Sequence, residues 1–438
     1  MDQMLNVLIL TRSVWDDTNS LGNTMSNFWS SYDSDRIANL YCRQALPNNK
    51  VCFNYFTISE KFIVLNLFNF KKKPGRHFRI TRKYDNGINN NLTGNTDEQL
   101  YKYFRRNPSW MAIWAQEMIW KIGNWRNSNL SSFLKEFQPQ IIFAPCFSNS
   151  YMHNVLWYIA TKTKSKVVLF HADDYLSTRG LGGNLLDKFS RSIRSKYVKK
   201  SALKADLNYC ISHKQQEEYE RIIEKEMKLL YKGSDFSEQP PAPVKSHTDF
   251  IKIVYVGSTL YGRWKTLGIL ARTIKKINAI KPIFELQIYS QYKPSVESVK
   301  EMIIEGASKF LGKVPASDVP NIMKNADIVL HIESFDDIEK QKTRLSFSTK
   351  IVDCLASGRA LMAIGWQEAA SIDYLVKNDA ALVAFDEKAI KEQLNKIAEN
   401  PSLLETYARK AWECGKRNHQ IDEIQKRLYN ELAQLIQE

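Results

Sequence analysis

The sequence predicts two open α/β domains in tandem, followed by a helical segment. Short apolar runs with the length of buried parallel strands alternate with segments of helical length, and this alternation occurs twice. A proline-rich stretch separates the two series. The chain has 438 residues, 44% of them hydrophobic and 25% charged, which is enough length and apolar content for two or three well-packed domains.

The first domain is expected at residues 1–236. Its predicted strands are "LNVLIL", "ANLYC", "QIIFAP", "KVVLF" and "LNYCIS". Residues 110–127 and 151–162 have helical length and lie between these runs, as in a doubly wound sheet. Residues 69–95 break the rhythm with "KKKPGRHFRITRK" and an asparagine-rich run, so we expect a basic excursion or loop there.

A linker is predicted at residues 237–250, where "SEQPPAPVKSHTD" has three prolines and one valine as its only large apolar residue. The second domain is expected at residues 251–415. Its predicted strands are "IKIVYVGS", "FELQIYS", "DIVLHIES", "RALMAIG" and "AALVAF". The pattern is helical from Glu387 onward, and we expect residues 416–438 to form a helix that returns to the first domain.

Cysteine usage and hydropathy indicate a cytoplasmic protein. The six cysteines are scattered without a Cys-x-x-Cys pair or a neighbouring histidine at metal spacing, so we expect reduced core residues and no metal site. No apolar run reaches the ~18–20 residues of a spanning helix, and the N-terminus has no signal pattern. Peripheral attachment to the inner face of the cell membrane is compatible with these features.

The basic charge is concentrated in the first domain. The chain has a net charge of +15, and residues 1–236 hold 34 Lys and Arg against 21 Asp and Glu. This asymmetry indicates an anionic partner: a lipid surface, a phosphorylated acceptor or nucleic acid. Because no nucleic-acid-binding motif is present, we do not expect nucleic acid.

One segment of the first domain, residues 185–204, has the pattern of a basic amphipathic helix. Leu185, Leu186, Phe189, Ile193 and Tyr197 recur at helical spacing between lysines and arginines. Such a helix could lie on an anionic membrane. The alternative is that its apolar face packs within the domain and its charges are solvated.

Two facing α/β sheets place a ligand at the carboxyl ends of their strands, where loops and helix N-termini gather. In "VYVGSTLYGRWKTL" a predicted strand ends at Gly257, and Arg263 and Lys265 precede a helix. Two cations and several backbone N–H groups there predict a diphosphate site. The alternative is a solvated helix start whose glycines serve only the turn.

A second group of candidate residues is found in "SFSTKIVDCLASG". Ser348 and Thr349 fall at a predicted helix start, Lys350 can add a positive charge for phosphate, and Asp353 could accept hydrogen bonds from a ribose diol. The alternative is that Ser348 or Thr349 is a plain N-cap and Lys350 is solvated.

A third group ends an apolar strand of the first domain. In "VVLFHADDY", His171 could bind a sugar, and Asp173 or Asp174 could take a proton from an attacking hydroxyl. A capped Asp-Asp turn is the alternative.

The loop expected after the first strand carries Gly22, Asn23 and Thr24. A glycine at this position would let a ligand approach the backbone closely.

Together these motifs resemble GT-B glycosyltransferases, and the sequence is most similar to glycosyltransferase family 4 enzymes of capsular and other surface polysaccharide assembly. The resemblance covers nearly the whole chain. It implies two Rossmann-like domains that face each other across a cleft, a nucleotide-diphosphate sugar as donor, and no cofactor or metal. It also implies donor-binding roles for Gly257, Arg263, Lys265, Gly312, Ser348, Thr349, Lys350 and Asp353. On the acceptor side it implies roles for Gly22, Asn23, Thr24, His171, Asp173 and Asp174.

One departure from the family pattern matters, because the first of two expected carboxylates is missing. The family has two glutamates separated by seven residues, and this chain has Leu345 and Asp353 at the corresponding positions. Glu333 and Asp336, after the "VLHI" strand, are candidates for the missing carboxylate. The resemblance implies retention of the anomeric configuration.

We therefore expect a metal-independent glycosyltransferase that acts on a sugar, glycolipid or polysaccharide acceptor. One alternative is a nucleotide-sugar 2-epimerase on the same scaffold, which would not need a basic acceptor domain. Another alternative is a catalytically silent subunit that binds a nucleotide sugar or lipid, and the absence of a carboxylate at Leu345 keeps this alternative open.

Overall fold

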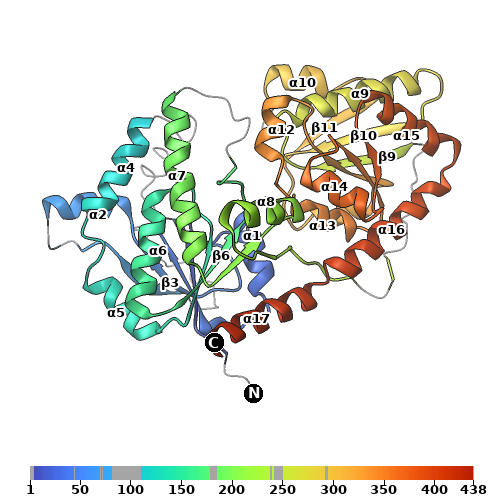
Figure 1. Cartoon of the computed structure of the whole chain (residues 1–438). Coiled ribbons are helices and arrows are strands. Elements are labelled where there is room, and N and C mark those ends of the chain that lie inside the picture. The colour runs from blue at the N-terminus through green and yellow to red at the C-terminus, as the bar shows by residue number, and fades with distance from the viewer. Residues whose placement is uncertain are drawn as a thin grey trace.

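The computed structural model describes residues 4–43, 45–69, 71, 73–80, 110–177, 185–236, 239–240, 250–291 and 294–437. The chain folds into two α/β domains, drawn at the left and the upper right of Figure 1. Most of the predicted linker, and most of the predicted basic excursion at 69–95, lie outside the described residues.

The first domain is built on an eight-stranded sheet in the order β4-β3-β2-β1-β5-β6-β7-β8. All neighbouring strands are parallel except β3 and β4. The strands are β1 (Val7–Thr11), β2 (Ile37–Tyr41), β3 (Asn54–Thr57), β4 (Arg76–Arg79), β5 (Ile141–Pro145), β6 (Lys166–His171), β7 (Leu207–Cys210) and β8 (Lys228–Leu229).

Helices cover both faces of this sheet. The helices of the first domain are α1 (Ser20–Trp29), α2 (Glu60–Phe68), α4 (Trp110–Ile122), α5 (Ser128–Phe137), α6 (Ser150–Thr163), α7 (Leu185–Lys204) and α8 (His213–Ile223). Alternation along β1 separates the two faces: Leu8 and Leu10 pack in the cluster that contains α5 and α6, whereas Val7 and Ile9 pack with α1. The central strands are therefore apolar on both sides, as in parallel sheets that are fully covered.

The second domain has a six-stranded sheet in the order β11-β10-β9-β12-β13-β14, entirely parallel. Its strands are β9 (Ile251–Val256), β10 (Phe284–Tyr289), β11 (Ser308–Gly312), β12 (Ile328–Ile332), β13 (Ala360–Ile364) and β14 (Leu382–Ala384). Its helices are α9 (Arg263–Asn278), α10 (Val296–Met302), α11 (Val319–Lys324), α12 (Asp337–Thr343), α13 (Lys350–Leu355), α14 (Ala370–Lys377) and α15 (Glu387–Glu399). This strand order is that of a Rossmann-like sheet, in which the order of the strands along the chain reverses between β9 and β12 while all strands stay parallel.

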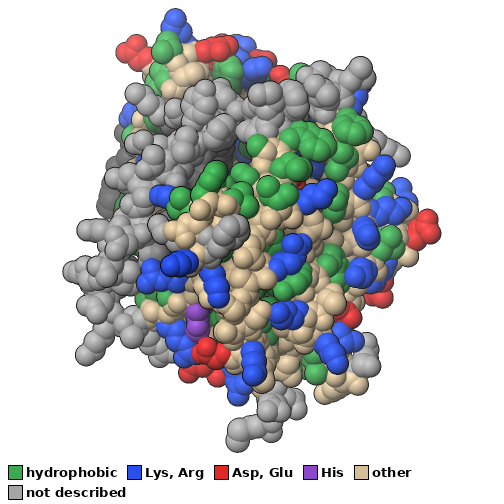
Figure 2. Space-filling model, turned by 90° about the vertical axis from the view of Figure 1, so that its left-hand side faces the viewer, with side chains coloured by type: hydrophobic (Ala, Val, Ile, Leu, Met, Phe, Trp, Pro, Cys, Tyr) green, Lys and Arg blue, Asp and Glu red, His purple; other side chains and the backbone are tan. Residues whose placement is uncertain are grey.

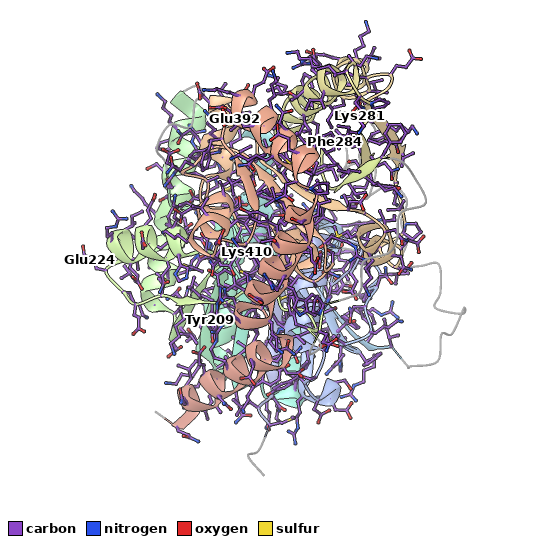
Figure 3. All side chains as sticks on the ribbon, turned by 90° about the vertical axis from the view of Figure 1, so that its right-hand side faces the viewer. Tyr209, Glu224, Lys281, Phe284, Glu392 and Lys410 are labelled. Carbon is purple, nitrogen blue, oxygen red and sulfur yellow. The ribbon has the colours of Figure 1, made fainter. Side chains whose placement is uncertain are left out.

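The last two helices connect the domains. In Figure 3, α16 (Ser402–Asn418) and α17 (Ile421–Gln437) descend across the side of the molecule from the second domain to the first. On α17, Tyr429 stacks on Trp29 and donates a hydrogen bond to the Phe28 carbonyl, and Glu431 accepts a hydrogen bond from Tyr209. The C-terminal helix thus lies on the first domain, and the predicted boundary at residues 415–416 falls inside α16.

The strands named from the sequence match β1, β2, β5, β6 and β7 in the first sheet and β9, β10, β12, β13 and β14 in the second. The remaining strands were not predicted. Of these, β4 lies in the predicted basic excursion, where it pairs antiparallel with β3 as an edge strand whose Arg76 and Arg79 are exposed. An edge strand can carry charges because one of its sides faces solvent.

The described part of the predicted apolar stripe of α7 is not buried as a whole: Ile193 is half-buried, and the side chains of Leu185 and Leu186 lie outside the described residues. The buried side chains of α7 include Val198, Ser201 and Ala202, whereas Phe189 and Tyr197 are exposed. The side that packs against the domain therefore consists of small residues, and two of the predicted aromatic positions face solvent.

Candidate functional site

A cleft of about 1300 Å³ lies between the two domains. Thr11 and Arg12 line it at the end of β1, and Val256 and Gly257 line it at the end of β9. Both positions are next to the place where strand order reverses in the respective sheet. Ligands of open α/β sheets bind at such points, so the topology selects this cleft as the candidate site.

The turn between β9 and α9 is shaped by two glycines. A Cβ atom on Gly257 would come within 2.5 Å of the Tyr255 ring. Gly262 has a φ of +70°, and a Cβ there would lie 2.3 Å from the Ser334 hydroxyl. Only glycine fits these positions without movement of its neighbours, and the tight turn sets the first residue of α9, Arg263, at the cleft.

Arg263 is held in the cleft by a buried carboxylate. Its Nη2 lies 3.0 Å from Glu333 Oε2, and its Nε donates to the Ile332 carbonyl at 2.9 Å. Glu333 is 1% exposed, and its other oxygen, Oε1, accepts from the Ser371 hydroxyl at 3.2 Å. The guanidinium is thus fixed at the strand ends of the second sheet before any ligand arrives.

Glu333 is ionised in this environment. Burial alone would raise its pKa, but the Arg263 charge and the neighbouring His331, whose Nε2 lies 3.3 Å away, outweigh burial and lower the pKa to about 2. A carboxylate so strongly paired is a poor proton acceptor. Glu333 lines the cleft, but its contacts are those of a residue that positions Arg263 rather than of a catalytic base.

Lys265, predicted to act beside Arg263, lies elsewhere. It does not line the cleft, its side chain is 52% exposed, and its Nζ pairs with Asp336 Oδ2 at 3.2 Å. The reason is helical geometry, because residues two apart on a helix point about 200° away from each other. The second predicted substitute carboxylate, Asp336, is the partner of this exposed lysine and caps α12.

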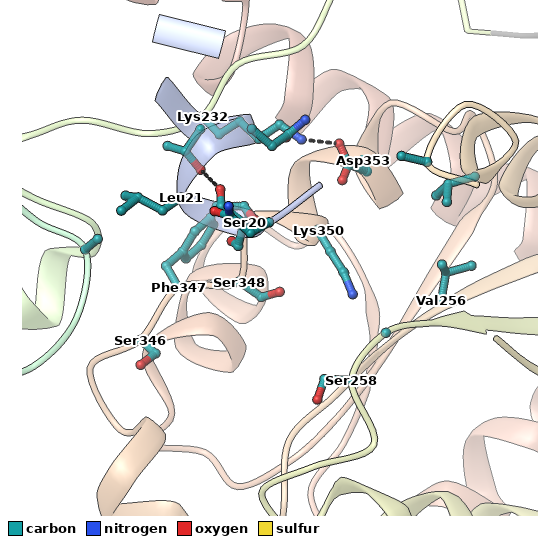
Figure 4. Close-up of a pocket in the computed structure, with 18 of the residues that line it drawn as sticks. Ser20, Leu21, Lys232, Val256, Ser258, Ser346, Phe347, Ser348, Lys350 and Asp353 are labelled. Carbon is teal, nitrogen blue, oxygen red and sulfur yellow. Dashed lines mark hydrogen bonds and ion pairs between the residues drawn. The ribbon is translucent and has the colours of Figure 1, made fainter. Parts of the chain in front are cut away.

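Lys350 is another cation that lines the cleft. Figure 4 shows its side chain extending from α13 into the open space toward the loop that carries Val256 and Ser258. Among the described residues, no hydrogen bond or ion pair holds its ammonium group. Loss of hydration in the cleft and then the nearby Arg263 charge lower the pKa of Lys350, as expected of an amine that faces another cation without a close counter-ion.

Ser348 and Thr349 also line the cleft. Thr349 is the N-cap residue of α13, but its side chain makes no capping hydrogen bond, and the Ser348 contribution to the turn is its backbone carbonyl, which accepts from Ile351. The structure therefore does not show the plain N-cap that was the alternative for these two hydroxyls.

Asp353 faces the cleft with one oxygen already paired. Its Oδ1 lies 2.7 Å from the Nζ of Lys232. Figure 4 marks this ion pair with a dashed line. Lys232 precedes the predicted linker, and the neighbouring Gly233 is bound to Asn27 of α1 through both its N–H and its carbonyl. This ion pair therefore connects the α13 wall of the cleft to the first domain.

The three residues predicted at the end of β6 lie in different environments. Asp173 lines the cleft and is exposed, and it accepts a hydrogen bond from the Tyr175 hydroxyl at 3.2 Å. Loss of hydration in the cleft wall raises its pKa. Asp174 points away from the cleft and caps the following turn, where its Oδ1 accepts from the backbone N–H of Ser177 and from the Tyr219 hydroxyl.

His171 is 0% exposed and does not line the cleft. Its Nε2 is 3.1 Å from Asn208 Oδ1, its ring packs edge-on against Tyr219, and burial lowers its pKa to about 4. In this arrangement it is a neutral core histidine. The predicted sugar contact has no support from its position.

The predicted glycine loop of the first domain is the first turn of α1. Asn23 and Thr24 line the cleft, and Gly22 does not. A Cβ on Gly22 would lie 2.0 Å from the Asp16 carbonyl oxygen. This glycine therefore serves close packing of the chain on itself rather than the approach of a ligand.

Gly312 ends β11 with a φ of +78°, and its carbonyl accepts from the Ser290 N–H. It does not line the cleft, but the next residue, Lys313, does. Three other cations that line the cleft, Arg12, Lys232 and Lys324, were not predicted. A signal for Arg12 was available in the sequence, since it directly follows the first strand.

Leu345, which stands where the resemblance places a glutamate, is 1% exposed and belongs to the hydrophobic cluster of the first domain. Its carbonyl accepts from the Ser212 hydroxyl at 2.8 Å. Beside it, Arg344 pairs with Glu218 at 2.6 Å. This position is therefore part of the contact between the domains, where an apolar side chain fills the space.

The part of the chain that the structure describes contains no candidate metal site, because no three or more His, Cys, Asp or Glu side chains come together there. Nor does any described helix have the length and apolar content needed to cross a membrane.

Comparison with solved structures assigns the fold. HepE from Anabaena, in complex with UDP and glucose, matches with a TM-score of 0.61 and 13% identity over 98% of this chain and 99% of that one. Sucrose-phosphate synthase from Thermosynechococcus elongatus matches with a TM-score of 0.63 and 12% identity over 98% and 99% of the two chains. The chain has the GT-B fold.

A third GT-B structure with this similarity is WaaG, a glycosyltransferase involved in lipopolysaccharide biosynthesis, with a TM-score of 0.56 and 12% identity over 97% and 99% of the chains. A family described as glycosyl transferase-like matches residues 269–430, which span most of the second domain and reach into α17. No curated protein sequence matches the chain. The predicted fold and the resemblance to GT-B glycosyltransferases are thus confirmed.

Proposed function

We propose that this protein is a glycosyltransferase that moves a sugar from a nucleotide-diphosphate donor to an acceptor hydroxyl. The observation that carries the proposal is the pair of cations, Arg263 and Lys350, which line the same wall of the interdomain cleft. The HepE and sucrose-phosphate synthase folds and the glycosyl transferase-like match over residues 269–430 support the same conclusion.

The two cations fit the chemistry of the departing group. When the bond from the anomeric carbon to the diphosphate breaks, negative charge grows on the diphosphate oxygens and must be stabilised. Arg263 is preorganised by Glu333, and the Lys350 ammonium has no competing partner among the described residues. Because these side chains supply the charge, we propose that the reaction needs no metal ion.

The opposite wall of the cleft carries the group best placed to meet an acceptor. Asp173 is exposed there and has a raised pKa, as expected of a carboxylate that accepts a proton from a hydroxyl. Leu345 leaves no carboxylate at the position where the related enzymes have a glutamate, so Asp173 is our proposed catalytic group. Retention of configuration follows from the resemblance and remains part of the proposal.

The acceptor is proposed to be a lipid-linked saccharide or a polysaccharide, in line with the excess positive charge of residues 1–236. The cleft volume of about 1300 Å³ accommodates a nucleotide sugar together with part of an acceptor.

The test is a panel of UDP-, GDP- and ADP-sugars incubated with the purified protein and a lipid extract. We expect release of one nucleoside diphosphate, unaffected by a chelator, together with a labelled product in the lipid or polysaccharide fraction. A donor that is bound but neither transferred nor hydrolysed would instead identify a silent binding subunit, a second candidate that the Leu345 position favours. Epimerisation without transfer would overturn the proposal.

A further inference from the structure

Two neighbouring surface helices of the first domain expose an unusual number of large apolar side chains. On α2 and α4 these are Phe62, Leu67, Phe68, Ile113, Trp114, Met118 and Ile122, and we call them the α2–α4 surface. Phe68 is 85% exposed and Trp114 is 48% exposed. Figure 2 looks onto the side of the molecule that is at the left in Figure 1, where α2 and α4 lie, and shows hydrophobic and basic side chains side by side.

Both helices are apolar on their outer side as well as on their inner side. Ile63 of α2 and Trp120 of α4 are buried, and the two helices are joined by Glu60, which accepts hydrogen bonds from Trp120 and Gln116. A surface helix normally presents polar residues to water. In the second domain, by contrast, the most exposed apolar side chains, Ile280 and Val296, lie singly on separate elements, which is ordinary for a soluble surface.

Among the residues that the structure describes, the exposed charges around the α2–α4 surface are positive. The exposed cations are Lys61, Lys71, Lys73, Lys121 and Arg126, and none of them takes part in an ion pair with a described residue. The two acids of these helices are occupied: Glu60 bridges α2 and α4, and Glu117 accepts from the backbone N–H of Ser150 at 3.0 Å. Burial raises the pKa of Glu117.

This composition favours a lipid surface over a protein partner. Lysine is depleted from the buried centre of protein–protein interfaces, whereas Trp and Phe inserted at the level of lipid head groups are commonly flanked by lysines. Each lysine near an anionic leaflet adds to the attraction, and the aliphatic part of its side chain can lie along the apolar layer. We infer that the α2–α4 surface binds the protein to an anionic membrane.

The α2–α4 surface is also connected to the cleft. Gln116 and Glu117 of α4 contact Asn149 and Ser150, at 3.5 and 3.0 Å respectively, and Asn149 lines the cleft on the side of the first domain. A membrane bound at α2 and α4 would therefore lie beside the acceptor half of the cleft. If the proposed sugar transfer is correct, this geometry favours an acceptor anchored in that membrane.

The inference is tested by co-flotation of the full chain with phosphatidylcholine vesicles, with and without phosphatidylglycerol, in the absence of any nucleotide sugar. We expect flotation only with the anionic vesicles, and we expect it to fall as salt rises. The variant F68S/W114S changes two exposed side chains, so it should keep the wild-type thermal midpoint but lose most of the floated fraction. The matched control I280S/V296S, in the second domain, should float like the wild type.

Charge is tested separately by K71E/K121E, which should lower flotation, against the control Lys281→Glu, which should not. Wild-type flotation by F68S/W114S would overturn the inference. A second result would also overturn it: the wild type does not float with any vesicles and is a dimer, and F68S/W114S is a monomer. The α2–α4 surface would then bind a second copy of the chain. The flotation experiment includes no sugar donor, so it tests membrane binding alone. Failure of the donor panel, which tests sugar transfer, can therefore be distinguished from failure of membrane binding.

Discussion

The guanidinium of Arg263 and the carboxylate of Glu333 form a 3.0 Å ion pair at the end of two adjacent strands, β9 and β12. The acid is buried and the arginine faces the cleft, so the pair places a fixed positive charge where a diphosphate would bind. A carboxylate that seemed suited to replace the absent glutamate at Leu345 instead holds the group that would bind the donor.

Replacement of Glu333 by Gln should therefore weaken donor binding rather than abolish chemistry. With Arg263 no longer held, we expect affinity for the selected nucleoside diphosphate to fall about tenfold, or ~1.4 kcal/mol. Turnover at saturating donor should change much less. Titration calorimetry and steady-state kinetics measure the two effects, and a large loss of turnover with unchanged affinity would restore Glu333 as a catalytic group.

The same pair predicts a pH dependence of stability. The folded-state pKa of Glu333, about 2, is below its ordinary value of 4.5, so the ion pair stabilises the fold fully above about 4.5. That stabilisation is lost as the pH falls from 4.5 through 2. We expect E333Q to be less stable than the wild type by about 3 kcal/mol at neutral pH, and this difference to shrink as the pH falls through that window. Denaturant unfolding at a series of pH values checks this, and a difference independent of pH would contradict it.

Asp353 is predicted to recognise a ribose. The selected nucleoside diphosphate should bind the wild type about tenfold more tightly than its 2′-deoxy form, because one hydrogen bond to a charged group is lost. Asp353→Asn should remove most of this preference. The control Lys232→Met breaks the same 2.7 Å ion pair but keeps the carboxylate, so the preference should remain. Equal preferences in the two variants would assign the ribose contact elsewhere.

Asp173 and Asp174 are adjacent in the sequence, but their variants should behave differently. Asp173→Asn should keep donor affinity and lower turnover, because Asp173 faces the cleft. Wild-type turnover should rise with pH through the pKa of Asp173, which loss of hydration in the cleft wall raises above 3.8, and the variant should lack this acidic limb. Asp174→Asn should chiefly lower the thermal midpoint, since Asp174 caps a turn. Unchanged turnover in Asp173→Asn would remove it from the mechanism.

Leu345→Glu, which introduces the carboxylate that the resemblance to family 4 enzymes places here, should damage the fold rather than raise activity. The side chain is buried in the first domain's hydrophobic cluster, and an uncompensated charge there costs about 3–5 kcal/mol. Leu345→Met, which keeps an apolar side chain of similar volume, should cost less than about 1.5 kcal/mol. Denaturant unfolding compares the two variants, and a stable, more active Leu345→Glu would show that this site is open to the cleft.

Much of the fold could be predicted because buried parallel strands are continuous apolar runs, such as β1 and β12, and the alternation with helices sets the sheet type. Short edge strands such as β4 and β11 could not, since one side of each faces solvent and neither is a continuous apolar run.

The candidate site was harder to predict because it depends on the direction in which each side chain points. Arg263 and Lys265 are both basic and lie two residues apart, but they project from different sides of α9, and only Arg263 lines the cleft. His171 ends a strand, as a catalytic group would, but its side chain alternates into the core. Lys232 and Asp353 are 121 residues apart, and only the tertiary structure brings them together.

The central claim is that Arg263 and Lys350 bind the diphosphate of the donor. Titration calorimetry of the selected nucleoside diphosphate against Arg263→Ala, Lys350→Ala and the control Lys265→Ala tests it most directly, since Lys265 carries the same charge outside the cleft. We predict a loss of affinity of at least about tenfold in each of the first two variants and wild-type affinity in the third. Wild-type affinity in both Arg263→Ala and Lys350→Ala would contradict the account.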